Sequence, residues 1–194
     1  GRYEAVLARL VETIAFLQNP RGSFRTFYAP AERNDCQNFY PGEALLFWAH
    51  ALKAGVPGVT SEAYMHAFRY YRWHFRNNPN PAFIPWHTQA DFVARDIIAN
   101  PELDDFIFEM NDWLLSVQQW HTAPSADMLG RFFDPARPWL GTAHASATGV
   151  YLEGLVDAFA LARLRNDGAR VASYRQAILR AAKNLARLQF RTDD

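Results

Sequence analysis

Residues 40–53 read YPGEALLFWAHALK, a stretch that would be apolar on almost every side if it formed a helix. Pro41 suits the first turn of such a helix, and Gly55 suits its end. Only three charged or titratable side chains interrupt the apolar surface between them. A helix of this kind must be covered on both sides, whereas a helix with one apolar stripe needs a single covering layer. The stretch therefore predicts a buried inner helix.

The same design occurs twice more along the chain. We expect mostly apolar helices from about residue 86 to 98 and from about residue 150 to 161. Amphipathic helices follow the apolar ones, starting near Ser61, Pro101 and Arg170, and another is expected at residues 3–18. This alternation is typical of stacked α-hairpins. We predict an all-α fold of about seven helices, with an inner layer wrapped by an outer one.

Composition and charge narrow the possible classes of protein. The chain has 194 residues, of which 49% are hydrophobic and 15% aromatic, so we expect one domain over 1–194 with a substantial core. Twenty Lys and Arg balance twenty Asp and Glu, which argues against nucleic acid or an anionic membrane as a partner. Cys36 is the only cysteine, so an internal disulfide is excluded. No apolar run approaches the ~20 residues of a membrane span, and the compartment stays open among cytoplasmic, periplasmic and secreted.

Three phrases of the sequence carry a resemblance to known proteins. Residues 38–46 (NFYPGEALL), 149–155 (GVYLEGL) and 184–190 (NLARLQF) resemble helical-hairpin toroids of the six-hairpin glycosidase type. That superfamily includes N-acylglucosamine 2-epimerases, unsaturated glucuronyl hydrolases and the helical domains of glucuronyl C5-epimerases. The resemblance implies an (α/α) toroid that acts on carbohydrates. A closed toroid has six hairpins, and about three and a half are expected here, so we predict an incomplete (α/α)6 barrel with further C-terminal hairpins or a partner chain.

Candidate catalytic residues lie where connections meet the starts of the inner helices, because loops on a rigid scaffold often carry function. His87 and Asp91 are four residues apart, which places them on one helix face. A carboxylate beside an imidazole raises its basicity and orients its ring, as a general base requires. The alternative is an ordinary pair on a solvated helix face. Trp86 and Gln89 in the same segment are candidate substrate-binding residues.

Two further residues are candidate acids. Glu43, at the start of an apolar helix, could protonate a leaving group, or it could simply favour the positive end of the helix dipole. His144 lies in the run GTAHASATG at residues 141–149, where small residues allow close backbone approach to a ligand. The same small residues could instead serve tight helix packing.

The remaining candidates are substrate-binding residues. Glu153 shares a helical stripe with Gly149 and Asp157, and this stripe could line a cavity or pair with arginines of a neighbouring helix. Tyr40, Trp139 and Arg33 precede inner helices and could supply stacking, hydroxyl and cationic contacts. Loop residues of these types are more often simply packed or surface side chains.

Two other chemistries are weighed and set aside. His87, Asp91 and His144 could form a His/His/carboxylate metal set, but no paired-histidine motif is present, so we expect neither metal nor cofactor. Residues 68–76 alternate arginines with aromatic residues, as single-stranded nucleic-acid sites do. Helical phasing assigns the aromatic residues to packing and the arginines to an exposed edge, so no nucleic acid is expected.

Together with the candidate residues, the resemblance implies a carbohydrate-active enzyme that uses acid/base chemistry on a glycan or a uronic-acid polymer. The reaction would be hydrolysis, lyase elimination or epimerisation, with His87 as base and Glu43 or His144 as acid. The alternative is a non-catalytic helical module that binds a protein or glycan partner on its concave face.

Overall fold

The computed structural model describes residues 2–30, 32–121, 123–141 and 144–189. Within these ranges the chain forms seven α-helices and three short 3₁₀ helices, with isolated β-bridges in place of strands. The α-helices are α1 (Arg2–Leu17), α2 (Tyr40–Lys53), α3 (Ser61–Asn77), α4 (Ile84–Ala94), α5 (Pro101–Ser116), α6 (Ala145–Leu164) and α7 (Gly168–Arg187). The 3₁₀ helices are η1 (Pro81–Phe83), η2 (Ala126–Met128) and η3 (Pro138–Leu140). The predicted all-α class is confirmed.

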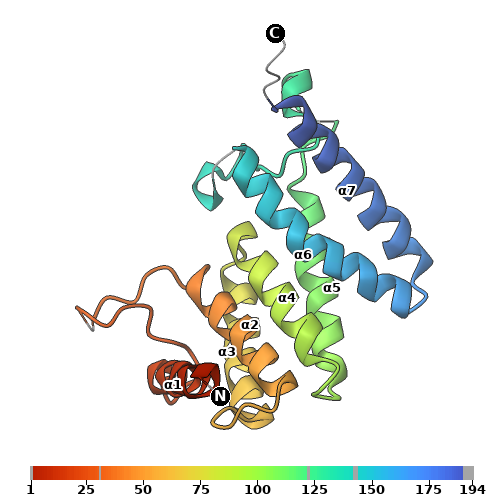
Figure 1. The fold of residues 1–194 in the computed structure, drawn as a ribbon. Coiled ribbons are helices and arrows are strands. Elements are labelled where there is room, and N and C mark those ends of the chain that lie inside the picture. The colour runs from red at the N-terminus through yellow and green to blue at the C-terminus, as the bar shows by residue number, and fades with distance from the viewer. Residues whose placement is uncertain (1, 31, 122, 142–143, 190–194) are drawn as a thin grey trace.

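The helices form two layers, as Figure 1 shows. The mostly apolar helices α2, α4 and α6 make the inner layer, with α4 packed against α2 on one side and α6 on the other. Each inner helix also packs against the amphipathic helix that follows it, so the pairs α2–α3, α4–α5 and α6–α7 are hairpins. Helix α1 precedes them and contacts α2. The described residues therefore make three hairpins and one additional helix.

Helix boundaries follow local capping chemistry. The Thr60 side chain accepts a hydrogen bond from the Ala63 N–H at the start of α3, and Asn100 accepts one from Glu102 N–H at the start of α5. Such caps satisfy backbone donors that have no partner within the helix. After α2, Gly55 adopts a φ of +68°, a left-handed conformation that glycine tolerates at the end of a helix.

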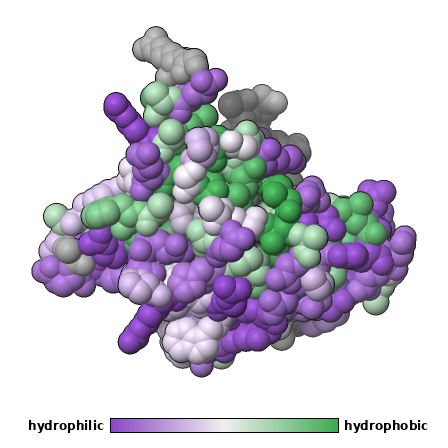
Figure 2. Space-filling view, turned by 90° about the horizontal axis from the view of Figure 1, so that it is seen from below, coloured by the Kyte–Doolittle hydropathy of each residue, from purple (hydrophilic) through white to green (hydrophobic). Residues whose placement is uncertain are grey.

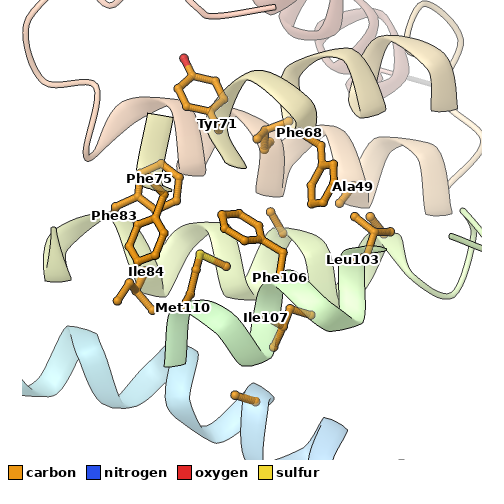
Figure 3. Packing of buried hydrophobic residues seen from close by; sticks show 14 of the residues in the cluster. Ala49, Phe68, Tyr71, Phe75, Phe83, Ile84, Leu103, Phe106, Ile107 and Met110 are labelled. Atoms are coloured by element: carbon orange, nitrogen blue, oxygen red, sulfur yellow. The ribbon is translucent and has the colours of Figure 1, made fainter. Parts of the chain in front are cut away.

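The core lies between the layers and is rich in aromatic rings (Figure 3). Phe106 of α5 is fully buried and meets two rings of α3 edge to face, with centroid distances of 5.6 Å to Phe68 and 5.8 Å to Phe75. Burying one such side chain contributes roughly 1.5–3 kcal/mol, and edge-to-face pairs add to that value. The stripe of α3 expected to face inward, including Tyr64 and Tyr71, is buried as predicted.

Two inner helices differ from their predicted bounds. Helix α4 begins at Ile84, directly after η1, and ends at Ala94 rather than near residue 98. Helix α6 begins at Ala145 rather than near residue 150, because His144 caps it with its imidazole. The small residues Ala145, Ser146 and Ala147 therefore form the first turn of α6.

Apolar side chains remain exposed at both ends of the array. Leu10 and Phe16 of α1 are exposed, as are Val156 and Leu164 of the inner helix α6. Figure 2 shows one face of the molecule, on which apolar residues near the centre are surrounded by hydrophilic ones. No helix in the described ranges combines the length and the apolar character needed to cross a membrane.

Candidate functional site

The three inner helices begin at the same end of the molecule (Figure 1). A hollow of about 530 Å³, which we call the aromatic groove, opens there. It is lined by Phe39, Asn80, Ala82, Trp86, Trp139, Leu140, Gly141, His144, Ser146, Ala147, Val150 and Tyr151. Phe39 precedes α2, Trp86 lies in the first turn of α4, and Ser146 lies in the first turn of α6. The groove therefore lies where the connections meet the inner helices.

Two glycines hold the first turn of α4 between its neighbours. A Cβ atom placed on Gly42 of α2 would lie 2.6 Å from the Cβ of Trp86. A Cβ atom on Gly154 of α6 would lie 2.7 Å from the Cα of Pro85. Real Cβ atoms do not approach other atoms so closely, so only glycine permits this spacing of the three helices. The backbone at the start of α4 is thus held between α2 and α6. The side chain of Trp86 stays half-exposed at the groove.

The polar side chains of the groove also serve as caps. Nδ1 of His144 accepts the Ala147 N–H at 3.2 Å and lies 2.7 Å from the Ser146 hydroxyl oxygen. Because Nδ1 acts as an acceptor, the proton of the neutral imidazole is on Nε2 and forms a hydrogen-bond donor. Asn80 accepts the Ala82 N–H at 2.9 Å. Tyr151 is almost fully buried, and this burial raises the pKa of its hydroxyl.

His87 and Asp91 lie inside the protein and not on the groove wall. The His87 ring stacks on Phe83 with centroids 3.6 Å apart, and the hydroxyl of Tyr64 donates to Oδ1 of Asp91 at 2.8 Å. Burial lowers the pKa of His87 well below its usual value, and the charge of His74 lowers it further. Burial raises the pKa of Asp91 to about 8, although the Tyr64 hydrogen bond opposes this.

The raised basicity expected for His87 beside Asp91 is not found in the structure, because burial lowers the pKa of His87. Both side chains are uncharged near neutral pH, so Asp91 does not raise the basicity of His87. The four-residue spacing does place both on one face of α4, but that face is covered by aromatic residues of η1 and α3. Nε2 of His87 and Oδ2 of Asp91 have no hydrogen-bond partner among the described residues.

Other sequence candidates lie away from the groove. Glu43 is exposed on α2, and Tyr40 lines a separate hollow together with residues of α1. Arg33 forms an exposed ion pair with Asp35, with Nε and Oδ1 2.6 Å apart. Its guanidinium group also lies over the ring of Phe27.

The last two candidates belong to the inner helices. The Gln89 amide donates to the Pro85 carbonyl oxygen one turn earlier in α4, at 3.3 Å. Glu153 is exposed on α6 and does not line the groove. Of the ten candidates named from the sequence, the groove brings together Trp86, Trp139 and His144.

Several groove residues were not named from the sequence. Phe39 directly precedes an inner helix, and Asn80 precedes Pro81 in the manner of a helix cap, so both had a detectable signal. The signal for Val150 and Tyr151 was weaker. Whether a residue inside a helix faces the groove depends on how that helix packs against helices far away in the sequence. Leu140 lies in η3, whose path the sequence did not indicate.

Comparison with known proteins gives no family for this chain. No protein-family model, curated protein or solved structure matches it. In the described ranges, no group of three or more His, Cys, Asp or Glu side chains is arranged to hold a metal ion. The fold defines an α-hairpin array, and the site is a groove of aromatic and uncharged polar side chains.

Proposed function

We propose that this protein binds a carbohydrate in the aromatic groove. The observation that carries the proposal is the convergence of Trp86 and Trp139 with His144 on one hollow. A sugar ring has apolar C–H faces and a polar edge of hydroxyl groups. Indole faces carry partial negative charge and pack well against C–H groups, while imidazole and hydroxyl groups bond to the edge. The groove offers both kinds of contact.

The size of the groove suits a small ligand. Its volume of about 530 Å³ lies within the ~300–1,000 Å³ range of small-molecule pockets. A stable protein partner requires roughly 800 Å² of buried surface on each side, which is a much broader area. The groove is therefore better suited to a few sugar rings than to a folded protein domain.

The distribution of carboxylates favours binding without turnover. Glycoside hydrolysis normally uses two carboxylates that flank the scissile bond at ~5–10 Å from each other. Among the described residues that line the groove there is no Asp or Glu. Glu43 and Glu153 are exposed elsewhere, and Asp91 is buried against Tyr64. The non-catalytic helical module is thus the form of the proposal that the geometry supports best.

One experiment tests binding and turnover together. The purified chain is titrated by calorimetry with hexasaccharides of glucose, xylose, mannose and N-acetylglucosamine, and each mixture is then analysed for shortened, unsaturated or epimerised products. We expect a saturable binding heat for at least one sugar. We also expect the sugars to remain intact, with no shortened, unsaturated or epimerised products. Products that accumulate with time would favour the carbohydrate-active enzyme instead. Absence of binding by every sugar would contradict the proposal.

A further inference from the structure

We infer that the aromatic groove selects uncharged sugars and rejects glycans that carry carboxylate, sulfate or phosphate groups. This inference rests on the proposed carbohydrate binding and specifies its ligand class. The described lining of the groove contains aromatic, aliphatic and uncharged polar side chains together with one histidine, and no Lys, Arg, Asp or Glu.

The ionic groups beside the groove neutralise each other. A second, smaller hollow shares Leu140, Gly141 and Tyr151 with the groove and is lined also by Asp134 and Arg137. Nε of Arg137 lies 2.6 Å from Oδ2 of Asp134, so this guanidinium group already has a carboxylate partner. A sugar carboxylate would have to displace that partner before it could gain an ion pair.

Helices α2, α4 and α6 begin at the groove, and helix N-termini carry partial positive charge that could attract an anion. At the start of α6, His144 reduces this attraction, since its Nδ1 already accepts the Ala147 N–H. An anion that enters the groove would lose its water without gaining a cation, and burial of an unpaired charge is strongly unfavourable. A hydroxyl group loses much less and finds donors and acceptors in Asn80, Ser146 and His144.

The test compares sugars of the same ring, linkage and length whose main difference is the charge at C6. Oligomers of galacturonic acid and their fully methyl-esterified forms share ring, linkage and length, and β-1,4-glucose oligomers are compared with β-1,4-glucuronic acid oligomers of equal length. Affinities are measured by calorimetry at low and at physiological salt for the wild type and for Trp86→Ala. Wherever a pair of oligomers binds, we expect the uncharged member to bind at least about tenfold more tightly than the acidic one. The affinity of the uncharged member should change little with salt concentration.

The outcomes separate this inference from the proposed function. Tighter binding of the acidic member that is weakened in Trp86→Ala would overturn the charge selection while supporting a carbohydrate-binding groove. Affinity that is unchanged in both Trp86→Ala and Trp139→Ala would place the ligand elsewhere and overturn both statements. Absence of binding by these oligomers and by the neutral hexasaccharides would also overturn both. A gain-of-charge variant gives an independent check, because Val150→Arg introduces a cation into the lining. We expect this variant to bind the acidic oligomers more tightly than the wild type does.

Discussion

Gly42 of α2 and Trp86 of α4 approach so closely that a Cβ atom on Gly42 would lie 2.6 Å from the Cβ of Trp86. The clash cannot be relieved by rotation of a side chain, because a Cβ is fixed by its own backbone. The N-terminal turns of the two inner helices can therefore pack at this distance only while position 42 is glycine. The position of the Trp86 indole in the groove therefore depends on Gly42, which does not itself line the groove.

Gly42→Ala should consequently weaken both the fold and the binding of sugar. We expect a loss of about 1–3 kcal/mol in the free energy of unfolding, as for other overpacked sites. Gly149→Ala is the matched control on α6, since a Cβ there meets nothing within 4 Å. That control should be neutral or gain up to about 1 kcal/mol from its helix propensity. Chemical denaturation of both variants checks this, and equal stability of the two would contradict the close packing.

The two groove tryptophans should matter for affinity while a third exposed tryptophan should not. Trp86→Ala and Trp139→Ala are each expected to weaken sugar binding about fivefold to tenfold, in line with ~1–1.4 kcal/mol for an aromatic contact. Trp73→Ala is the control, because Trp73 is 58% exposed on α3 and lies outside the groove. Calorimetric titration measures all three. A loss of affinity confined to Trp73→Ala would move the site to the outer layer.

The buried Asp91 should make stability fall as pH rises. Its pKa is raised to about 8, above the ~3.9 of an unfolded chain, so the folded state holds more protons at this site between those values. Stability is therefore lost progressively from about pH 4 to about pH 8. His87 acts in the opposite direction, because its lowered pKa removes stability as pH falls below ~6.5.

Asp91→Asn keeps the shape of the side chain and removes its charge. We expect the Tm of this variant to change less than that of the wild type between about pH 6.5 and about pH 8. Asp105→Asn, at an exposed position of α5, serves as the control and should follow the wild-type profile. Thermal unfolding at a series of pH values measures the difference. An identical slope for Asp91→Asn and the wild type would show that Asp91 is not buried in its protonated form.

Neighbouring residues of α6 should respond very differently to a new charge. Leu155 is fully buried, whereas Val156 is 48% exposed. Leu155→Asp puts an unpaired carboxylate in the core and should abolish soluble expression. Val156→Asp should change stability by no more than about 0.5 kcal/mol. Soluble yield and Tm of the two variants test the inner-layer assignment, and similar behaviour of both would refute it.

The fold could be predicted because its determinants are local. A helix apolar on all sides, such as α2, signals its burial through its own sequence, and capping residues such as Thr60 mark where helices begin. The boundaries of α4 and α6 were less accurate. The residues usually found at helix N-caps are Ser, Thr, Asp and Asn, so no clear signal in the sequence indicated that His144 would cap α6.

The candidate site followed from the sequence only in part. Its expected place was the start of the inner helices, and Trp86, Trp139 and His144, which were named on that ground, line the aromatic groove. The spacing of His87 and Asp91 correctly places them on one helix face, but spacing does not reveal what covers that face. Phe83 and Tyr64 cover it, and they come from other elements of the fold.

The indole N–H signals of the six tryptophans give the most direct test of sugar binding in the aromatic groove. Each signal is assigned in the two-dimensional nitrogen–proton NMR spectrum by a single Trp→Phe substitution, and an uncharged hexasaccharide that binds in calorimetry is then added. We expect the signals of Trp86 and Trp139 to shift in a saturable manner, while those of the buried Trp48 and of Trp73, which does not line the groove, stay in place. Unchanged signals for Trp86 and Trp139 at saturating sugar would contradict the account.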